Sequence, residues 1–223
     1  MSDVKQRFER FLDPDKAAEK RVLLVGCGGI GSWLAHSLVR MGVSLSVCDF
    51  DKVEEANVGV QAFSLEDVGV HKTEALYDQF LLMDMTCGVY TERFNVDVVE
   101  GVKPHAVVLA LDSLKARKEC VGVLRSVQWR GRLFDPRMSL QSGEVNSMDV
   151  KWGDADFEAS YVSPLDDTDA IQEPCGARSI AYTGMMAAAI TSAAVAAWLR
   201  EDVWPKWQAF GLHNGMNVVP TLR

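Results

Sequence analysis

Four glycines near the start of the chain have the spacing of a phosphate-binding loop. They lie in the segment Gly26–Gly31, which reads GCGGIG, follows the apolar run Val22–Val25 and precedes a stretch with helical periodicity. Glycines let a phosphate approach the backbone closely, and the N-terminus of the following helix adds N–H donors and a positive dipole. Asp49 ends the next apolar run, where a carboxylate can accept hydrogen bonds from ribose hydroxyls. These residues predict a nucleotide site, and they suit NAD and ATP equally.

A second set of polar side chains indicates chemistry at a triphosphate. The first three members lie in one irregular loop after Asp49, the fourth opens the next predicted helix, and the fifth ends a later apolar run. They are Asp51, Asn57, Gln61, Lys72 and Asp112. A lysine stabilises charge on phosphate oxygens, and a carboxylate can hold magnesium. Because loops at the carboxyl ends of strands gather over one crevice in a doubly wound sheet, we expect this set to surround one triphosphate. Hydride transfer has no need of it.

The order of apolar runs and helical stretches predicts an α/β fold. We expect one doubly wound (Rossmann-like), mostly parallel sheet with an antiparallel extension. Residues 22–25 and 106–112 are continuous apolar runs, as in strands buried on both faces. A helix joins the first run to the strand SLSVC, which makes a right-handed βαβ unit. Residues 138–152 alternate about Ser142-Gly143 and predict a hairpin that extends the sheet.

The rest of the chain predicts one domain over residues 1–223. Its expected parts are an N-terminal helix and linker (1–20), a nucleotide-binding core (21–150), an acidic crossover loop (154–178), and a buried helix with terminal strands (179–223). Residues 154–173 hold seven acidic residues and no basic one, which indicates a mobile loop. The stretch Ala181–Leu199 carries no charge over 19 residues. It is rich in Ala, Ser and Thr, so a buried helix is favoured over a membrane span.

Composition narrows the classes of partner. The chain has 223 residues, 48% of them hydrophobic and 24% charged, with a formal net charge of −8. Its basic residues are scattered, so we expect no nucleic-acid partner and no membrane partner. The five cysteines include no CxxC pair, so no zinc is expected, and free thiols suit a cytoplasmic protein.

The combined spacing resembles the ThiF/MoeB/HesA family, the adenylyltransferase relatives of ubiquitin-activating enzymes. The resemblance rests on VLLVGCGGIGSWLAHSLVRMGVSLSVCDFDKVEEANVGVQ, on VGVHK, and on ALDSLKAR, in which an Asp ends a strand and an Arg follows five residues on. It covers about Arg21 to Arg117 and implies a short, divergent member. The family implies that ATP binds with Mg²⁺ and that the C-terminal carboxylate of a ubiquitin-like or sulfur-carrier protein, or of a peptide, attacks the α-phosphate. Pyrophosphate then leaves, and an acyl adenylate forms.

The resemblance also implies roles for individual residues. Asp49 would bind ribose, Asn57 and Lys72 would contact phosphates, Asp112 would hold magnesium, and Asp51 and Gln61 would lie beside the nucleotide. The nucleotide-holding glycines would be Gly26, Gly28, Gly29 and Gly31.

Three further features follow from the family pattern. A basic residue of an N-terminal helix reaches the partner subunit's γ-phosphate in the family, so Arg7 or Arg10 would do so in a homodimer. Cys175 would accept the acyl group, or else it is a small buried residue. Family members commonly read Asn-x-x-Arg-Gln, whereas this chain has Val60 in place of that arginine. An apolar group cannot stabilise phosphate charge, and losing one such contact costs on the order of 3 kcal/mol at the transition state.

Two other functions remain open at this point. An NAD-dependent oxidoreductase would need only the glycine segment and Asp49. A non-catalytic binding module of the same fold is favoured by Val60, because the missing cation would slow turnover while the fold stayed intact.

Overall fold

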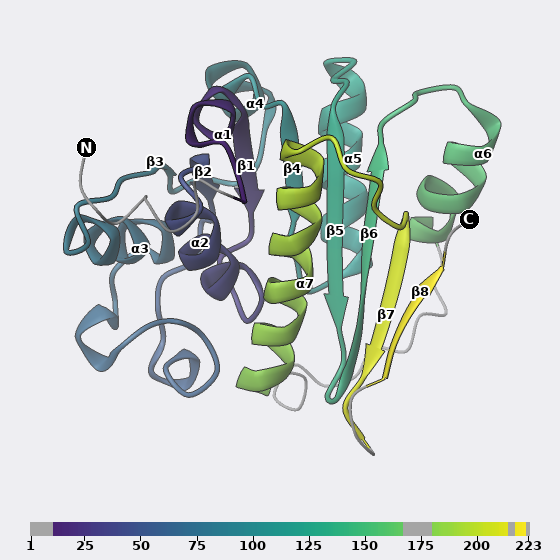
Figure 1. Ribbon diagram of the computed structural model, residues 1–223. Coiled ribbons are helices and arrows are strands. Elements are labelled where there is room, and N and C mark those ends of the chain that lie inside the picture. Colours follow the sequence, from purple (N-terminus) through teal and green to yellow (C-terminus); the bar gives the residue numbers. More distant parts are fainter. Residues whose placement is uncertain (1–10, 167–179, 214–216, 222–223) are drawn as a thin grey trace.

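In the computed structural model, eight strands form one sheet in the order β3-β2-β1-β4-β5-β6-β7-β8 (Figure 1). The structure describes residues 11–166, 180–213 and 217–221. The strands are β1 (Arg21–Val25), β2 (Ser44–Cys48), β3 (Gly88–Tyr90), β4 (Ala106–Leu109), β5 (Arg132–Met138), β6 (Ser142–Asp149), β7 (Trp207–Gly211) and β8 (Asn217–Thr221). The strands β1 to β5 are parallel to one another, and β6, β7 and β8 extend the sheet antiparallel from β5. The expected fold class is therefore confirmed.

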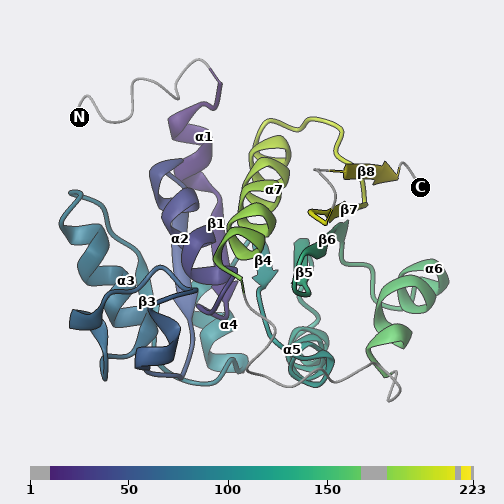
Figure 2. The ribbon, with the colours of Figure 1, turned by 90° about the horizontal axis from the view of Figure 1, so that it is seen from below.

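Helices cover both faces of the sheet. Figure 2, turned by 90° from Figure 1 and seen from below, shows α2 and α7 on one face and α4 and α5 on the other. The α-helices are α1 (Pro14–Glu19), α2 (Gly31–Arg40), α3 (Lys72–Leu81), α4 (Val96–Val102), α5 (Leu114–Ser126), α6 (Ala155–Phe157) and α7 (Ala181–Leu199). Alternate residues of β1 serve the two faces: Val22 and Leu24 pack with α2 and α7, whereas Leu23 and Val25 pack with α4 and α5. This explains the unbroken apolar run, because every side chain of the strand enters a core.

The strand order reverses direction at β1. Chain connections run from β1 to β2 and β3 on one side, and then cross back to β4 on the other side of β1. In such sheets a ligand binds outside the carboxyl ends of the strands at the point where the order reverses. The glycine segment leaves β1 at this point.

The uncharged stretch Ala181–Leu199 is a helix packed into the fold, as expected. It is α7, and it contacts α2, β5 and β6. Its length and composition would suffice to cross a membrane, but 61% of its most apolar window is buried inside the protein. Gly184 in its first turn lies against the carbonyl of Gly29, and a β-carbon at that position would collide with this oxygen. The small residue thus lets α7 lie directly over the glycine segment.

The described part of the acidic segment is helical, and the prediction of a mobile loop there was wrong. Residues 154–166 form α6, a π-helical turn η4 (Glu158–Val162) and a 3₁₀ turn η5 (Ser163–Asp166). Phe157, Tyr161 and Leu165 are buried against α5 and β5. The prediction failed because it weighed the acidic composition of the segment and overlooked the helical spacing of these three apolar residues. Residues 167–178 of the predicted crossover loop lie outside the described residues.

Three smaller expectations also change. The predicted linker contains α1, which Asp13 caps by accepting from the backbone N–H of Asp15, with Pro14 in its first turn. Ser142 and Gly143 belong to β6, so the hairpin turns at residues 139–141. β3 and α4 were not anticipated, because each is short. The helix predicted over residues 3–12 lies outside the described residues except for Phe11 and Leu12, which are not helical.

Candidate nucleotide-binding site

The glycine segment forms a tight turn from β1 into α2. Gly26 has φ +91°, and a β-carbon there would collide with the carbonyl of Ala110. A β-carbon on Gly31 would collide with the carbonyl of Gly26. Both positions therefore require glycine for the turn to close. Nothing lies within 4 Å of a β-carbon built on Gly28, so its backbone faces open space.

The first turn of α2 has free capacity for an anion. The N-cap residue is Ile30, and no side chain caps this end of the helix. Ser32 donates its hydroxyl back to the carbonyl of Gly28 (2.7 Å) and accepts from the N–H of Ala62 (3.0 Å). The hydroxyl thus fixes the loop and does not fill the helix end. The backbone N–H of Ser32 also donates to the carbonyl of Gly28 (3.0 Å), so a phosphate at this end would be bound by the neighbouring N–H groups, as is usual at a helix N-terminus.

Asp49 is joined to the glycine segment. One carboxylate oxygen accepts from the backbone N–H of Cys27 (2.6 Å), and the other accepts from that of Asp51 (2.8 Å). Burial raises the pKa of Asp49, and these two backbone hydrogen bonds oppose the rise. Each oxygen keeps a lone pair for a further donor, so the carboxylate can still accept ribose hydroxyls.

Lys72 lies in the same group of residues. Its side chain is 9% exposed, and its ammonium lies 3.2 Å from the carboxylate of Asp51, which is 51% exposed. The N–H of Lys72 also donates to the backbone carbonyl of Asp51 (3.0 Å). The structure therefore brings Asp49, Asp51, Lys72 and the glycine segment together, with one buried cation among them. A buried ammonium that has an exposed partner can exchange that partner for a phosphate oxygen.

The loop that holds Asn57 and Gln61 is anchored to α2. The Asn57 side-chain oxygen accepts from the N–H of Glu54 (2.9 Å), and its backbone carbonyl accepts from the N–H of Gln61 (2.8 Å). Trp33 donates its indole N–H to the carbonyl of Val60 (3.1 Å). Asn57 therefore has only its amide NH₂ for a ligand, and the side-chain oxygen of Gln61 is buried without a partner in the described part of the chain.

Asp112 is exposed in the turn between β4 and α5, and Arg117 holds this turn in place. The Arg117 guanidinium donates to the carbonyls of Leu111 (2.7 Å) and Ser113 (3.2 Å), on either side of Asp112. Gly26 abuts Ala110, so the turn also lies beside the glycine segment. Asp112 and Lys72 are thus both at the carboxyl edge of the sheet, on opposite sides of β1.

Sequence reasoning missed the buried ion-pair network behind this turn. Asp135 accepts from Arg117 (2.7 Å), from Arg137 (2.7 and 2.9 Å) and from the hydroxyl of Tyr161 (3.1 Å). Burial works to lower the pKa of Arg137, but the Asp135 carboxylate more than offsets this and the pKa is raised. The available signal was a single acidic residue in the middle of the strand RLFDPRM, next to Leu133 and Phe134, because a buried carboxylate must be accompanied by a cation.

Comparison with known proteins identifies the family. The sequence profile described as "ThiF family" matches residues 6–128, more than half of the chain. The chain belongs to the ThiF family. It is 27% identical over 159 residues to ubiquitin-like modifier-activating enzyme 5 of Drosophila mojavensis, and 26% identical to that of Culex quinquefasciatus. The match covers 71% of this chain and 39% of either relative, so this ThiF-family chain spans about two fifths of the curated relatives it matches.

Solved structures share the ThiF fold of this chain at low sequence identity. The structure of E. coli MccB with ATP has a TM-score of 0.75 at 17% identity and covers all of this chain and 73% of that one. PaaA gives 0.72 at 17% identity, covering 98% and 69% of the two chains. E. coli tRNA N6-threonylcarbamoyladenosine dehydratase, TcdA, gives 0.68 at 16% identity, covering 90% and 97%.

Several residues singled out in the sequence of this ThiF-family chain lie outside the described part. They are Arg7, Arg10 and Cys175. The predicted roles of these three side chains therefore stay predictions. Within the described part, no three His, Cys, Asp or Glu side chains form a metal-binding cluster.

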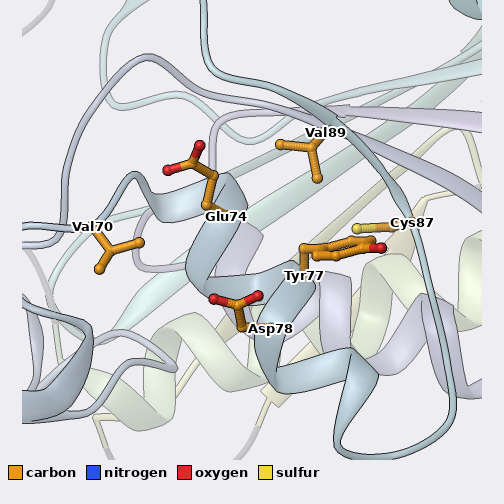
Figure 3. Close-up of a pocket in the computed structure, with 6 residues that line it drawn as sticks. All are labelled: Val70, Glu74, Tyr77, Asp78, Cys87 and Val89. Carbon is orange, nitrogen blue, oxygen red and sulfur yellow. The ribbon is translucent and has the colours of Figure 1, made fainter.

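A hollow beside α3 and β3 is not the nucleotide site predicted from the ThiF pattern. It measures about 560 Å³ and is lined by residues of α3, of β3 and of their flanking loops, among them Glu74, Asp78 and Cys87. Figure 3 shows the two carboxylates on the same helix, at the rim of the hollow. Two carboxylates repel phosphate, so this hollow is not suited to a triphosphate.

The other four cysteines of this ThiF-family chain are buried, and we expect them to be inert. Burial raises the pKa of Cys48 to about 12, of Cys87 to about 11 and of Cys120 to about 12, and it also raises the pKa of Cys27 well above its ordinary value. At pH 8 the reactive thiolate of Cys48, Cys87 and Cys120 is then on the order of one thousandth of each population or less. Treating the folded protein with iodoacetamide at pH 8 should leave these four unmodified by peptide mass spectrometry, whereas 8 M urea should expose all five. Rapid labelling of Cys27 in the folded protein would contradict the observed packing.

Proposed function

We propose that this chain catalyses ATP- and Mg²⁺-dependent adenylylation of a C-terminal carboxylate, on a ubiquitin-like or sulfur-carrier protein or on a peptide. The observation that carries the proposal is the group formed by Asp49, Asp51, Lys72 and the glycine segment at the carboxyl edge of the sheet. Family membership and the likeness to activating enzymes support the same activity. MccB, which shares the fold, has been solved with AMPCPP and MccA, which supports a peptide or protein substrate.

Each of these residues has a place in the proposed reaction. The backbone of Gly28 and the free end of α2 bind phosphate oxygens, and Asp49 accepts the ribose hydroxyls. The ammonium of Lys72 leaves Asp51 and neutralises charge that grows on the phosphate oxygens. A carboxylate oxygen of the substrate attacks the α-phosphorus, the bond to the bridging oxygen of the β-phosphate breaks, and pyrophosphate departs with that electron pair. The product is an acyl adenylate.

Asp112 fits the requirements of a magnesium ligand. Mg²⁺ bound with a nucleotide takes most of its ligands from phosphates and water and only one or two from protein carboxylates. An exposed carboxylate beside the glycine segment meets this need, whereas a cage of three side chains is not required. When bound, Mg²⁺ would offset the charge of the departing pyrophosphate.

The remaining assignments complete the proposal. The enzyme acts in the cytoplasm as a homodimer, in which Arg7 or Arg10 of one protomer reaches the γ-phosphate in its partner. Cys175 receives the acyl group from the adenylate where transfer follows. Val60 removes one phosphate contact, and the cation from the N-terminal segment offsets this loss.

ATP–pyrophosphate exchange tests the proposed function. Purified protein with Mg²⁺, ATP, labelled pyrophosphate and candidate proteins ending in Gly-Gly should return label to ATP, and omission of Mg²⁺ should stop the exchange. A non-catalytic binding module, which Val60 favours, would bind ATP without exchange for any acyl partner. Saturable binding of NADH with no binding of ATP would instead favour an oxidoreductase and contradict the proposal.

A further inference from the structure

An exposed aromatic side chain stands directly beside the proposed ribose carboxylate. Phe50 follows Asp49 in the chain and is 44% exposed. The guanidinium carbon of Arg93 lies 3.9 Å from the centre of its ring, so the cation is stacked on one face of the ring. No carboxylate in the described part of the chain lies within ion-pair distance of Arg93, so the cation's partner there is the ring itself.

Two contacts fix the segment that carries Arg93 against the end of β2. The backbone N–H of Asp49 donates to the carbonyl of Tyr90 (3.1 Å), and the thiol of Cys48 donates to the carbonyl of Glu92 (3.4 Å). The stacked pair is therefore built from two neighbouring strand ends whose relative position is set by hydrogen bonds. These hydrogen bonds distinguish the Phe50–Arg93 pair from a contact between two freely moving surface side chains.

The strand order gives the pair its place along a bound nucleotide. The neighbours β1, β2 and β3 end, in that order, at the glycine segment, at Asp49, and just before Arg93. A nucleotide has the same order of parts: phosphates, ribose and base. With phosphates over the glycine segment and ribose on Asp49, the base reaches the side of β2 that faces β3, where Phe50 and Arg93 lie.

We propose that Phe50 and Arg93 form a stacking platform for the purine base of the bound nucleotide. This inference rests on the proposed function, because it takes ATP as the ligand. An aromatic ring or a guanidinium plane binds any base through its π-face, so the platform contributes affinity for the base and not a choice between adenine and guanine. The phosphates are bound elsewhere and are unaffected by it.

The test compares ATP with inorganic tripolyphosphate, which has no base. Isothermal titration of the Phe50→Ala protein should show a dissociation constant for ATP raised about tenfold, with that for tripolyphosphate unchanged. Phe50→Trp should retain ATP affinity, because the ring is kept. Arg93→Ala should weaken ATP binding by a smaller factor, about threefold, since the ring remains.

A matched control is Phe11, which is 56% exposed and is also stacked with an arginine. The guanidinium carbon of Arg200 lies 3.8 Å from the centre of the Phe11 ring. Arg200 follows the C-terminal end of α7, whereas the first turn of that helix lies over the glycine segment, so Phe11 is far from the site. Phe11→Ala should leave the ratio of the two dissociation constants unchanged, because any effect through the neighbouring Arg10 would act on a phosphate that both compounds carry.

The remaining outcomes contradict either the stacking platform alone or the proposed function as well. ATP binding by Phe50→Ala at wild-type strength, or an equal loss for ATP and tripolyphosphate, overturns the platform and leaves the proposed function intact. A wild-type protein that binds neither compound overturns the proposed function, and the platform with it.

Discussion

Asp112→Ala is expected to lower the rate of ATP–pyrophosphate exchange by about 10²-fold or more, with folding intact. Asp112 is exposed, and Arg117 holds its turn through the carbonyls of Leu111 and Ser113, so the turn does not depend on the Asp112 side chain. Its carboxylate is the group placed to hold Mg²⁺ beside the triphosphate. The measurement is the initial exchange rate at saturating ATP, together with the thermal unfolding midpoint of the same preparation.

Asp78→Ala is the control for this prediction. Asp78 is also an exposed aspartate, but it lines the hollow beside α3, away from the glycine segment. Its removal changes the net charge equally and should leave exchange within about twofold of the wild type. If Asp112→Ala kept full exchange activity, the magnesium assignment would have to be given up.

The parallel half of the fold and the group around Asp49 could be predicted because their signals are local. The run VLLV, the glycines and the helix after them specify one βαβ unit, and the loop residues up to Lys72 follow within the same stretch of sequence. Backbone geometry makes Gly26 and Gly31 obligatory, and the strand ends then fix the neighbours of Asp49. Short elements were not predicted, because the three residues of β3 contain too little pattern to distinguish a strand from a loop.

The acidic segment was misjudged because its composition and its spacing disagree. Seven carboxylates in 154–173 indicated a mobile loop, yet Phe157, Tyr161 and Leu165 recur every four residues, which is the spacing of a buried helical stripe. The partner of that stripe is distant in sequence. Tyr161 bonds to Asp135, and an interaction between residues so far apart cannot be read from either segment alone.

Asp135→Ala is expected to destabilise the fold by about 3–5 kcal/mol, the largest effect on stability that we predict for a single substitution. Asp135 is fully buried and joins α5, β5 and the segment after β6 through Arg117, Arg137 and Tyr161. Without the carboxylate, the Arg117 guanidinium stays buried with no opposite charge beside it. Equilibrium unfolding in urea, followed by tryptophan fluorescence, measures the loss in the free energy of unfolding.

Two further substitutions separate the charge from the rest of the network. Asp149→Ala removes an aspartate of the same β5–β6 hairpin whose carboxylate is 66% exposed and lies 3.4 Å from Arg132, so it should cost less than about 1 kcal/mol. Tyr161→Phe removes one hydrogen bond and keeps the ring, so it should cost about 1 kcal/mol. If Asp135→Ala were no more costly than Asp149→Ala, water would have to reach the buried arginines, and the turn that carries Asp112 would not depend on this network for its position.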